Sequence, residues 1–382
     1  MKEIEVAVVG AGVAGLMAAR RLQERGADFV LFDEHARIGD SWRDRYDSLK
    51  LFSYRRYASL PGMRIPLDRR QCPSKDELAD YLEAYARRFE FPVRPSTRVM
   101  RVGRDGVDGF LLELESPTGV DRVRASRVII AAGAHRRPVR PPFADRLDPS
   151  ILQVHSLDYR SMEALPAGAV LVVGAGNSGT DIALDASRSG RPVVLAGRHP
   201  GQVPFKLDSL AGFLGAHVFL FVLRHLTVRT PAGRAAWARQ RGHGLMLIRN
   251  RLEDLAAAGV RRVGRVEGAR DGLPVVDGGE VLHPKVIIWC TGSRPDLSLL
   301  DLDGALDEDG APVHTEGISD TVPGLGFLGL DFQFSAASAT IQGMDRDARA
   351  VVAALLGRDT GRPVDRAADE PRDARDLSGR AA

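Results

Sequence analysis

Cysteine is nearly absent from the 382-residue chain, which has only Cys72 and Cys290, far apart in the sequence. This excludes a CxxC motif or another closely spaced redox pair, and with it dithiol–disulfide catalysis. Cys290 directly follows the apolar run Val286-Ile287-Ile288-Trp289, which is typical of a buried structural thiol. No combination of His, Cys and acidic residues has the spacing of metal ligands, so we expect no metal site.

A hydrophobic run long enough to span a bilayer is also lacking. The most apolar stretch, Phe213 to Leu223, has about half the required length and contains His217. We therefore expect a buried helix that lines a pocket or an interface, and contact with a membrane surface is the less favoured interpretation. The N-terminus runs directly into a strand and leaves no room for a signal or transit peptide, so we expect a cytoplasmic protein.

Lysine is scarce, occurring only at positions 2, 50, 75, 206 and 285, so nearly all the basic charge is arginine. The 53 basic residues are nearly balanced by 50 acidic ones, and the net charge is +3. Because the arginines are scattered and interleaved with acids, the sequence predicts no nucleic-acid partner. The length is sufficient for two domains with full cores.

Two glycine motifs are the most informative feature of the chain. The first, Gly10-Ala11-Gly12-Val13-Ala14-Gly15, follows a β-branched run and opens a helical stretch, Leu16 to Arg25. The first glycine permits a tight turn, the second lets backbone N–H groups approach a pyrophosphate, and the third lets helix and strand pack closely. The next strand, Phe29 to Phe32, ends at Asp33, 18 residues beyond Gly15. An acid at this position binds the ribose hydroxyls of FAD or NAD, and the adjacent Glu34 is the alternative to Asp33 for this role.

The second motif, Gly174-Ala175-Gly176-Asn177-Ser178-Gly179, follows the strand Val170 to Val173 and opens a helix, Asp181 to Ser189. Its second strand, Val193 to Ala196, is followed by Arg198 rather than by an acid. A guanidinium there suits a ribose 2′-phosphate, which predicts NADPH in this site. The alternative is an incidental surface arginine in an arginine-rich chain.

The order of the predicted elements gives the domain organisation. After the first βαβ unit we expect an irregular region from Leu49 to Asp68, a helix from Lys75 to Phe89, and a meander of short strands between positions 98 and 124 that crosses above the main sheet. A buried strand from Arg127 ends at Gly133, and its counterpart from Lys285 ends at Thr291-Gly292. We interpret both ends as crossings between two domains. A helix from Asp345 to Leu356 completes the first domain, and the tail beyond Gly357 has nothing apolar to bury.

These motifs together resemble the class B flavin-dependent monooxygenases, most of all their YUCCA-like branch and its bacterial relatives. The resemblance extends over residues 4 to 356. It rests on the two glycine motifs, on Gly39-Asp40-Ser41-Trp42, on Pro73-Ser74-Lys75 and on the late Thr291-Gly292.

The resemblance implies an α/β fold with two Rossmann-like dinucleotide-binding domains, as in glutathione-reductase-like flavoproteins. The FAD domain is discontinuous and comprises residues 1–160 and 293–356; the NADPH domain comprises residues 161–292, and residues 357–382 form a disordered tail. Besides the motif residues, the resemblance assigns Ser41, Trp42, Gly133, Thr291 and Gly292 to cofactor binding. Asn177 and Ser178 are expected to orient the nicotinamide or the pyrophosphate, and a homodimer is left open.

The activity implied is transfer of one oxygen atom from dioxygen to a small, mostly apolar or aromatic substrate through a flavin (hydro)peroxide. Such chemistry belongs to the flavin and needs neither triad nor metal. The family motif Phe-x-Gly-x-x-x-His is degraded here, since Pro149 and Ile151 replace its Phe and Gly and His155 remains. Tyr159-Arg160 stands where Baeyer–Villiger enzymes have Trp-Pro or Trp-Asp, which disfavours ketone oxygenation.

Catalytic residues are not identified by sequence, and Asn177 and His155 are weak candidates. His155 is equally consistent with a structural histidine at the hinge between the domains. Lys75, at a helix start, is interpreted as a solvated residue or a contact to the flavin region. Two other functions stay open: an NADPH-dependent flavin reductase or oxidase without oxygen insertion, and a nucleotide-sensing regulatory flavoprotein.

Overall fold

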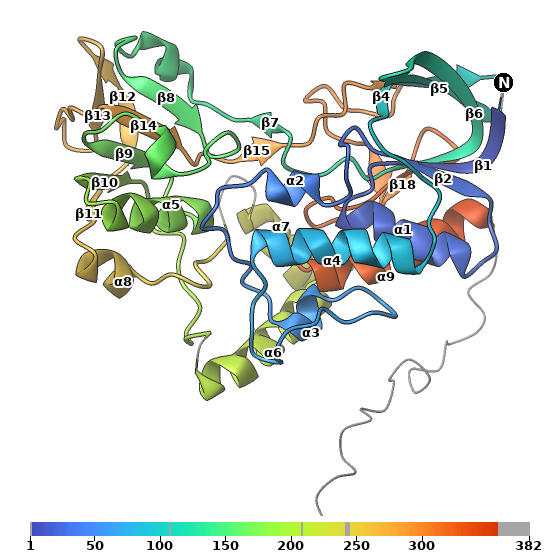
Figure 1. The fold of residues 1–382 in the computed structure, drawn as a ribbon, viewed down its shortest axis with the longest axis horizontal. Coiled ribbons are helices and arrows are strands. Elements are labelled where there is room, and N and C mark those ends of the chain that lie inside the picture. The colour runs from blue at the N-terminus through green and yellow to red at the C-terminus, as the bar shows by residue number, and fades with distance from the viewer. Residues whose placement is uncertain (1, 107, 208, 241–244, 358–382) are drawn as a thin grey trace, which may run out of the picture.

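Two twisted sheets organise the chain, and each is built around one of the glycine motifs (Figure 1). The computed structural model describes residues 2–106, 108–207, 209–240 and 245–357. The predicted tail, apart from Gly357, lies outside these described residues. The mixed α/β architecture, with one parallel-rich sheet around each glycine motif, confirms the predicted fold class.

In the first lobe, the parallel strands have the order β3-β2-β1-β6-β19, with β1 between β2 and β6. The antiparallel strands β4 and β5 continue from β6, and their inward side chains pack across one face of β1 and β2. This confirms the predicted meander over the main sheet. The strands of this lobe are β1 (Lys2–Val9), β2 (Phe29–Phe32), β3 (Val93–Arg94), β4 (Arg98–Asp105), β5 (Gly109–Ser116), β6 (Gly119–Ile130), β16 (Leu300–Asp301), β17 (His314–Thr315), β18 (Ile318–Ser319) and β19 (Leu325–Phe327).

Three long helices cover the opposite face of this sheet: α1 (Val13–Gln23), α4 (Lys75–Arg88) and α9 (Ile341–Leu356). Helix α4 begins where Ser74 and Glu77 form a capping box. Helix α9 begins four residues before the predicted start, because the Thr340 side chain accepts the Gly343 N–H and caps it. The short helices α2 (Asp40–Arg43) and α3 (Arg55–Ala58) interrupt the otherwise irregular region before α4.

The second lobe has five parallel strands in the order β11-β10-β9-β14-β8. Its core lies between this sheet and helix α5, and the strands β9 and β14 are buried along their whole length. The elements are η1 (Pro142–Arg146), β8 (Leu152–His155), η2 (Met162–Ala164), β9 (Val170–Val173), α5 (Asn177–Arg188), β10 (Val193–Ala196), α8 (Leu252–Ala257), β11 (Arg261–Val263), β12 (Val266–Arg270), β13 (Leu273–Val276) and β14 (Val286–Trp289).

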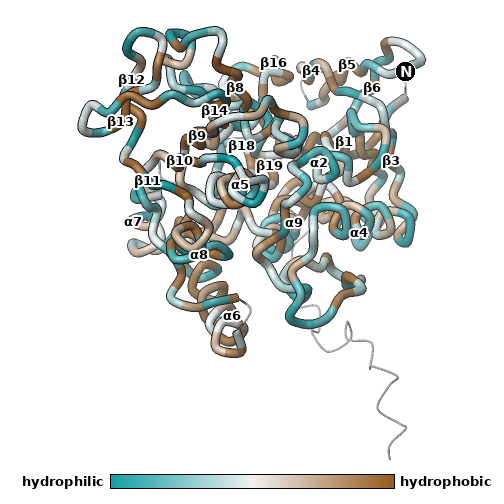
Figure 2. Tube along the Cα trace, turned by 60° about the vertical axis from the view of Figure 1, so that its left-hand side comes forward, coloured by the Kyte–Doolittle hydropathy of each residue, from teal (hydrophilic) through white to brown (hydrophobic). Residues whose placement is uncertain are grey.

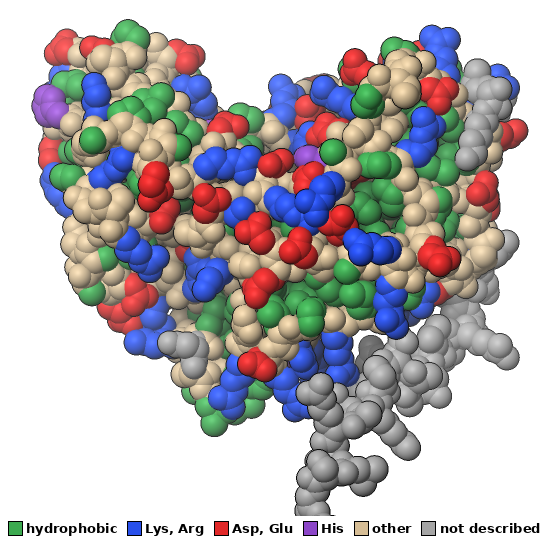
Figure 3. Space-filling model, viewed as in Figure 1, with side chains coloured by type: hydrophobic (Ala, Val, Ile, Leu, Met, Phe, Trp, Pro, Cys, Tyr) green, Lys and Arg blue, Asp and Glu red, His purple; other side chains and the backbone are tan. Residues whose placement is uncertain are grey.

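The chain passes between the lobes through two short strands that pair with each other. Strand β7 (Arg137–Pro138) runs antiparallel to β15 (Ser293–Arg294), and the pair lies between the two sheets (Figure 1). Additional backbone bonds join Val139 N–H to Gly292 O and Arg136 N–H to Arg294 O. Figure 3 shows the surface hollowed between the two lobes on this side of the molecule.

Helices α6 (Leu210–His225) and α7 (Pro231–Gln240) leave the second lobe and contact the first. The N–H of Val228 donates to Phe334 O at 2.9 Å, and that of Ala336 donates to Leu226 O at 3.0 Å. The expectation that the apolar stretch forms a buried helix is wrong, since Gly212 and Ala216 are the buried residues of α6. None of the helices in the described ranges combines the length and hydropathy needed to cross a bilayer.

Candidate functional site

The first glycine motif forms a turn whose three glycines have three different surroundings. Gly10 has a φ of +101°, and a Cβ on it would lie 2.5 Å from Ala131 O. A Cβ on Gly15 would lie 1.9 Å from Gly10 O, whereas a Cβ on Gly12 would have no heavy atom of the protein within 4 Å. The outer glycines are therefore required by the fold, and the central one borders open space where a ligand can approach the backbone.

The second motif repeats this arrangement. Gly174 has a φ of +111° and its Cβ would lie 2.2 Å from Cys290 O, while that of Gly179 would lie 1.8 Å from Gly174 O. A Cβ on Gly176 would again meet nothing within 4 Å. Burial raises the pKa of the Cys290 thiol to about 12, so that this neighbour of the motif is a neutral thiol at pH 7.

Both motif helices begin without a side-chain cap. Gly12 and Gly176 are the N-cap residues of α1 and α5, and the first turn of each helix contains no acidic residue. In contrast, Ser74 and Thr340 cap α4 and α9 with their side chains. The first turns of α1 and α5, with Val13, Ala14 and Ser178, thus leave N–H groups and the positive end of the helix dipole to an anionic ligand.

At the tip of β2, the Asp33 carboxylate binds the glycine turn itself. Its Oδ2 accepts the Ala11 N–H at 2.7 Å, and its Oδ1 accepts the N–H and the Nδ1 of His35, each at 2.9 Å. Burial alone would raise the pKa of the Asp33 carboxyl, but the hydrogen bonds from His35 and Ala11 outweigh it and hold that pKa below its usual value. The group is therefore a carboxylate that faces the first motif at neutral pH.

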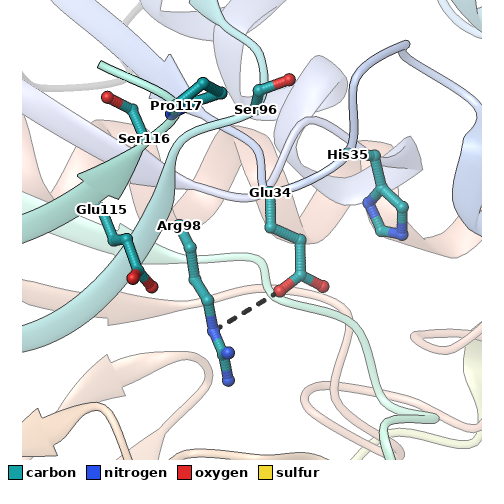
Figure 4. Close-up of a pocket in the computed structure, with 7 residues that line it drawn as sticks. All are labelled: Glu34, His35, Ser96, Arg98, Glu115, Ser116 and Pro117. Atoms are coloured by element: carbon teal, nitrogen blue, oxygen red, sulfur yellow. Dashed lines mark ion pairs between the residues drawn. The ribbon is translucent and has the colours of Figure 1, made fainter. Parts of the chain in front are cut away.

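Glu34, the alternative acid, lies in a shallow pocket beside this tip (Figure 4). It forms an ion pair with Arg98 at 3.7 Å and a second, close one with Arg136. Because both arginines draw Glu34 away from the glycine turn, Asp33 is the better placed acid for a ribose.

The tip of β10 has the same backbone pattern with different side chains. Gly197, Arg198 and His199 follow β10 as Asp33, Glu34 and His35 follow β2. A Cβ on Gly197 would lie 3.0 Å from Ala175 N, so no carboxylate occupies the place that Asp33 takes in the first lobe. Arg198 is exposed, and the pKa of the Asp277 carboxyl is lowered by the Arg265 N–H that it accepts and by the nearby charge of Arg198. This tip therefore offers a guanidinium where the first offers an acid.

The two crossings end in glycines with matching geometry. Gly133 and Gly292 have φ values of +90° and +87°, and a Cβ on either would meet nothing within 4 Å. The Thr291 hydroxyl donates to Val139 O at 2.5 Å and ties one crossing to the other. His155 lies at this point: its Nε2 is 3.1 Å from Gly292 O, and its Nδ1 accepts the Leu157 N–H at 3.2 Å. Both ring nitrogens thus have backbone partners, which favours a positioning role for His155.

Burial lowers the pKa of His155 below its ordinary value of 6.5. Because the unfolded chain then binds more protons than the folded one just below pH 6.5, stability falls as the pH drops through this window toward the lowered pKa. We expect His155→Gln, which keeps a donor for Gly292 O but does not titrate, to lose less stability on acidification. Between pH 7 and pH 5 the unfolding midpoint should fall by roughly 1–3 °C less than in the wild type. An equal decrease of the unfolding midpoint in the variant and the wild type would contradict this expectation. The matched control is His283→Gln, because His283 is exposed.

Other predicted site residues lie near the boundary between the lobes. The Asn177 amide donates to Met246 O and accepts the Ile248 N–H, each at 3.1 Å, so it holds the segment that follows α7. Ser41 is partly exposed, and Trp42 packs against the core of the first lobe. The interpretation of Lys75 as solvated is wrong, because its side chain is buried and its Nζ donates to Arg43 O at 2.9 Å.

A contact between the lobes that the sequence analysis missed centres on Asp181 of α5. Its carboxylate accepts the Tyr46 hydroxyl at 2.9 Å and pairs with Arg249 at 2.6 Å. Tyr46, from the segment after α2, thereby joins the hydrophobic core of the second lobe. Nearby, burial and the charges of Arg136 and Arg160 lower the pKa of Arg45.

Buried polar atoms without a partner occur on the elements that follow β19. Among the described residues these include Nε2 of Gln333, on the segment between β19 and α9, and Nε2 of Gln342, in the first turn of α9. This segment lies against the first motif, because a Cβ on Gly329 would be 3.3 Å from the Ala14 Cβ. The open cradles at Gly12 and Gly176 fit two bound dinucleotides. The described residues include no group of three or more His, Cys, Asp or Glu placed to hold a metal ion.

Comparison with known proteins agrees with this geometry. The profile of the pyridine nucleotide-disulphide oxidoreductase family matches residues 7–208. An uncharacterized CzcO-like oxidoreductase from Geobacillus kaustophilus is 32% identical over 92% of this chain and 98% of its own length. The indole-3-pyruvate monooxygenase YUCCA1 of Oryza sativa subsp. japonica is 27% identical over 76% of this chain and 77% of its own.

Among solved structures, a variant of a flavin monooxygenase from Stenotrophomonas maltophilia superposes with a TM-score of 0.74. It is 25% identical in sequence, and the alignment covers 94% of this chain and 99% of that one.

Proposed function

The chain belongs to the pyridine nucleotide-disulphide oxidoreductase family and, within it, to the class B flavin-dependent monooxygenases, and from this premise we propose its cofactors and its substrate class. It is an oxidoreductase that uses a flavin and a nicotinamide nucleotide, with a small molecule and dioxygen as substrates. The reductase and the regulatory alternatives are not favoured by these relatives.

We propose that the first cradle binds FAD. The N–H groups at the start of α1 would hold the pyrophosphate beside Gly12, and Asp33 would accept hydrogen bonds from the adenosine ribose. A full dinucleotide, rather than FMN, uses both the turn and the acid at the tip of β2.

The second cradle would bind NADPH. Gly176 leaves the same opening, and Gly197 brings no carboxylate to the place where an acid would repel a 2′-phosphate. The exposed Arg198 guanidinium would form charge-assisted hydrogen bonds with that phosphate. The repeated cradle with an acid at one tip and an arginine at the other is the single observation that carries the assignment of the two cofactors.

A flavin held in the first cradle would supply the oxygen chemistry, in which the nicotinamide nucleotide provides two electrons, one oxygen atom of dioxygen enters the substrate and the other leaves as water. The chain supplies orientation. The paired crossings with Thr291 and His155 fix the two cradles relative to each other, and Tyr46 and Asp181 hold the lobes together on another side. No residue of this set is needed as an acid, base or nucleophile.

For the substrate we propose a small, mostly apolar or aromatic compound that is oxygenated at nitrogen, sulfur or an activated carbon, or decarboxylated in the process. The likeness to a relative named for indole-3-pyruvate supports an aromatic compound. We also propose that residues 1–160 and 293–356 form the FAD domain and that residues 161–292 form the NADPH domain. A homodimer and a cytoplasmic location are further proposals. The two free cysteines suit a reducing compartment.

The test is the fate of labelled dioxygen. Purified protein supplied with NADPH and a panel of indole, sulfide and amine compounds should convert at least one of them to a product that carries a single oxygen-18 atom. Mass spectrometry of products, peroxide and water measures the distribution. If the label appears only in peroxide or water across the whole panel, oxygen insertion is contradicted. The reductase or oxidase function would then be favoured.

A further inference from the structure

Helix α6 carries a row of large apolar side chains on its exposed face. Leu214, Val218 and Phe221 are 60%, 65% and 62% exposed, and Leu210 and Val222 continue the row at its two ends. The spacing of four, four and three residues places them on one side of an α-helix. The opposite side carries the buried Gly212 and Ala216. The exposed row is therefore a defined face of α6 rather than a set of scattered residues.

This face lies at one end of the molecule. Figure 1 shows α6 at the lower end, below α3, and Figure 2, turned by 60°, shows it there again with predominantly hydrophobic colouring. In Figure 3 hydrophobic side chains form the lower tip, with Lys and Arg side chains beside them. A helix of 16 residues is about 24 Å long. The apolar row is therefore long enough to lie along a flat surface but too short to span a bilayer.

Basic residues outnumber acidic ones around this face, although acids also lie on the adjoining segments, where Asp68 is exposed and Glu253 pairs with Lys206. From Ser209 to Leu252 the sequence contains no Asp or Glu and seven Arg residues. On the neighbouring segment before α4, Arg56 and Arg70 are exposed. The Arg70 guanidinium lies over the ring of Phe213 of α6, 5.7 Å from its centroid. The ring of Tyr57 packs against His217 of α6. The charges of Arg56 and Arg224 lie near the Tyr57 hydroxyl, whose pKa is raised by burial and lowered in part by these charges. Arginines thus border the apolar row from α6 itself and from the adjoining segment.

An apolar face on a segment that contains arginines and lacks acids matches the chemistry of an anionic lipid surface. A second copy of the chain would fit less well, because a two-fold interface on this face would bring two acid-free, arginine-bearing segments together. We propose that α6 is a membrane-surface helix, which inserts Leu214, Val218 and Phe221 among the headgroups of a bilayer containing anionic lipids while the neighbouring arginines contact the lipid phosphates.

Vesicle flotation with the full-length, flavin-containing protein tests this proposal. The probes are vesicles of phosphatidylcholine alone and of equal parts phosphatidylcholine and phosphatidylglycerol. We expect binding to the anionic vesicles that weakens as salt is raised and is at least about tenfold weaker on phosphatidylcholine, since each basic residue at the surface contributes roughly fivefold. Val218→Asp should reduce binding to anionic vesicles by about tenfold or more.

Val120→Asp is the matched control, because Val120 is 78% exposed on the β5–β6 hairpin, away from α6. It should float like the wild type, and both variants should retain flavin and turnover because neither side chain belongs to the cradles. Absence of binding to anionic vesicles, or equal binding by both variants, would overturn the proposal. A dimer in vesicle-free solution that Val218→Asp converts to monomer would also overturn it and assign the face to self-association.

Discussion

Gly12→Val protein is expected to fold and to be purified without its yellow colour. A valine side chain at this position enters the open space above the first glycine turn, where the proposed pyrophosphate of FAD would lie, and flavin affinity should fall by roughly a hundredfold or more. The chain itself tolerates the change, because Gly12 has a φ of −76° and a Cβ there meets no protein atom within 4 Å. The stability of the flavin-free protein should change by only about 1 kcal/mol. Flavin absorbance per protein and thermal unfolding of the flavin-free form measure the two effects.

Gly176→Val is the matched control, since Gly176 has the same open surroundings in the second lobe and a φ of −79°. This variant should stay yellow and lose reduction of its flavin by NADPH. Together the pair separates ligand loss from misfolding. If Gly12→Val retains stoichiometric flavin, or if both variants lose it equally, the proposed assignment of the two cradles is wrong.

Arg198→Ala is expected to lower the preference for NADPH over NADH by one to two orders of magnitude. The substitution removes a charge-assisted contact to the proposed 2′-phosphate, worth about 1.5–3 kcal/mol. Turnover with NADH should hardly change, because NADH lacks that phosphate. The ratio of kcat/KM values for the two nucleotides is the measurement.

Arg188→Ala serves as the control for general charge, since Arg188 is exposed at the end of α5 in the same lobe. It should leave the ratio unchanged. Equal losses with NADPH and NADH in Arg198→Ala would mean that Arg198 supports the structure of the tip. Another residue would then bind the 2′-phosphate, and His199 is the next candidate along the chain.

The parts of the fold that depend on local rules were predictable from sequence. The strands Phe29–Phe32, Val170–Val173 and Val193–Ala196 have their predicted limits, because β-branched and apolar runs end there at turn residues. Helix α4 was predicted to within one residue, because its apolar residues recur on one helical face, and the capping box of Ser74 and Glu77 fixes its start. The roles of the outer glycines in each motif follow from the same local geometry.

Features that depend on tertiary packing were missed or wrong. The third meander strand and the buried strand that follows it are one 12-residue strand, β6, whose first half pairs with β5 and whose second half lies between β1 and β19. Apolar content suggested burial for α6, but burial requires a partner surface that local sequence does not encode. The contact of Tyr46 with Asp181 joins residues 135 positions apart and has no signal in either segment.

The pairing of the two crossings has a kinetic consequence. Strands β7 and β15 are bonded to each other, and α6 and α7 add a further connection to the first lobe. Two sites joined even by a short flexible linker meet at effective concentrations in the millimolar range, and paired strands restrict their relative orientations further. The encounter between ligands bound in the two cradles is therefore unimolecular, and its rate is independent of protein concentration.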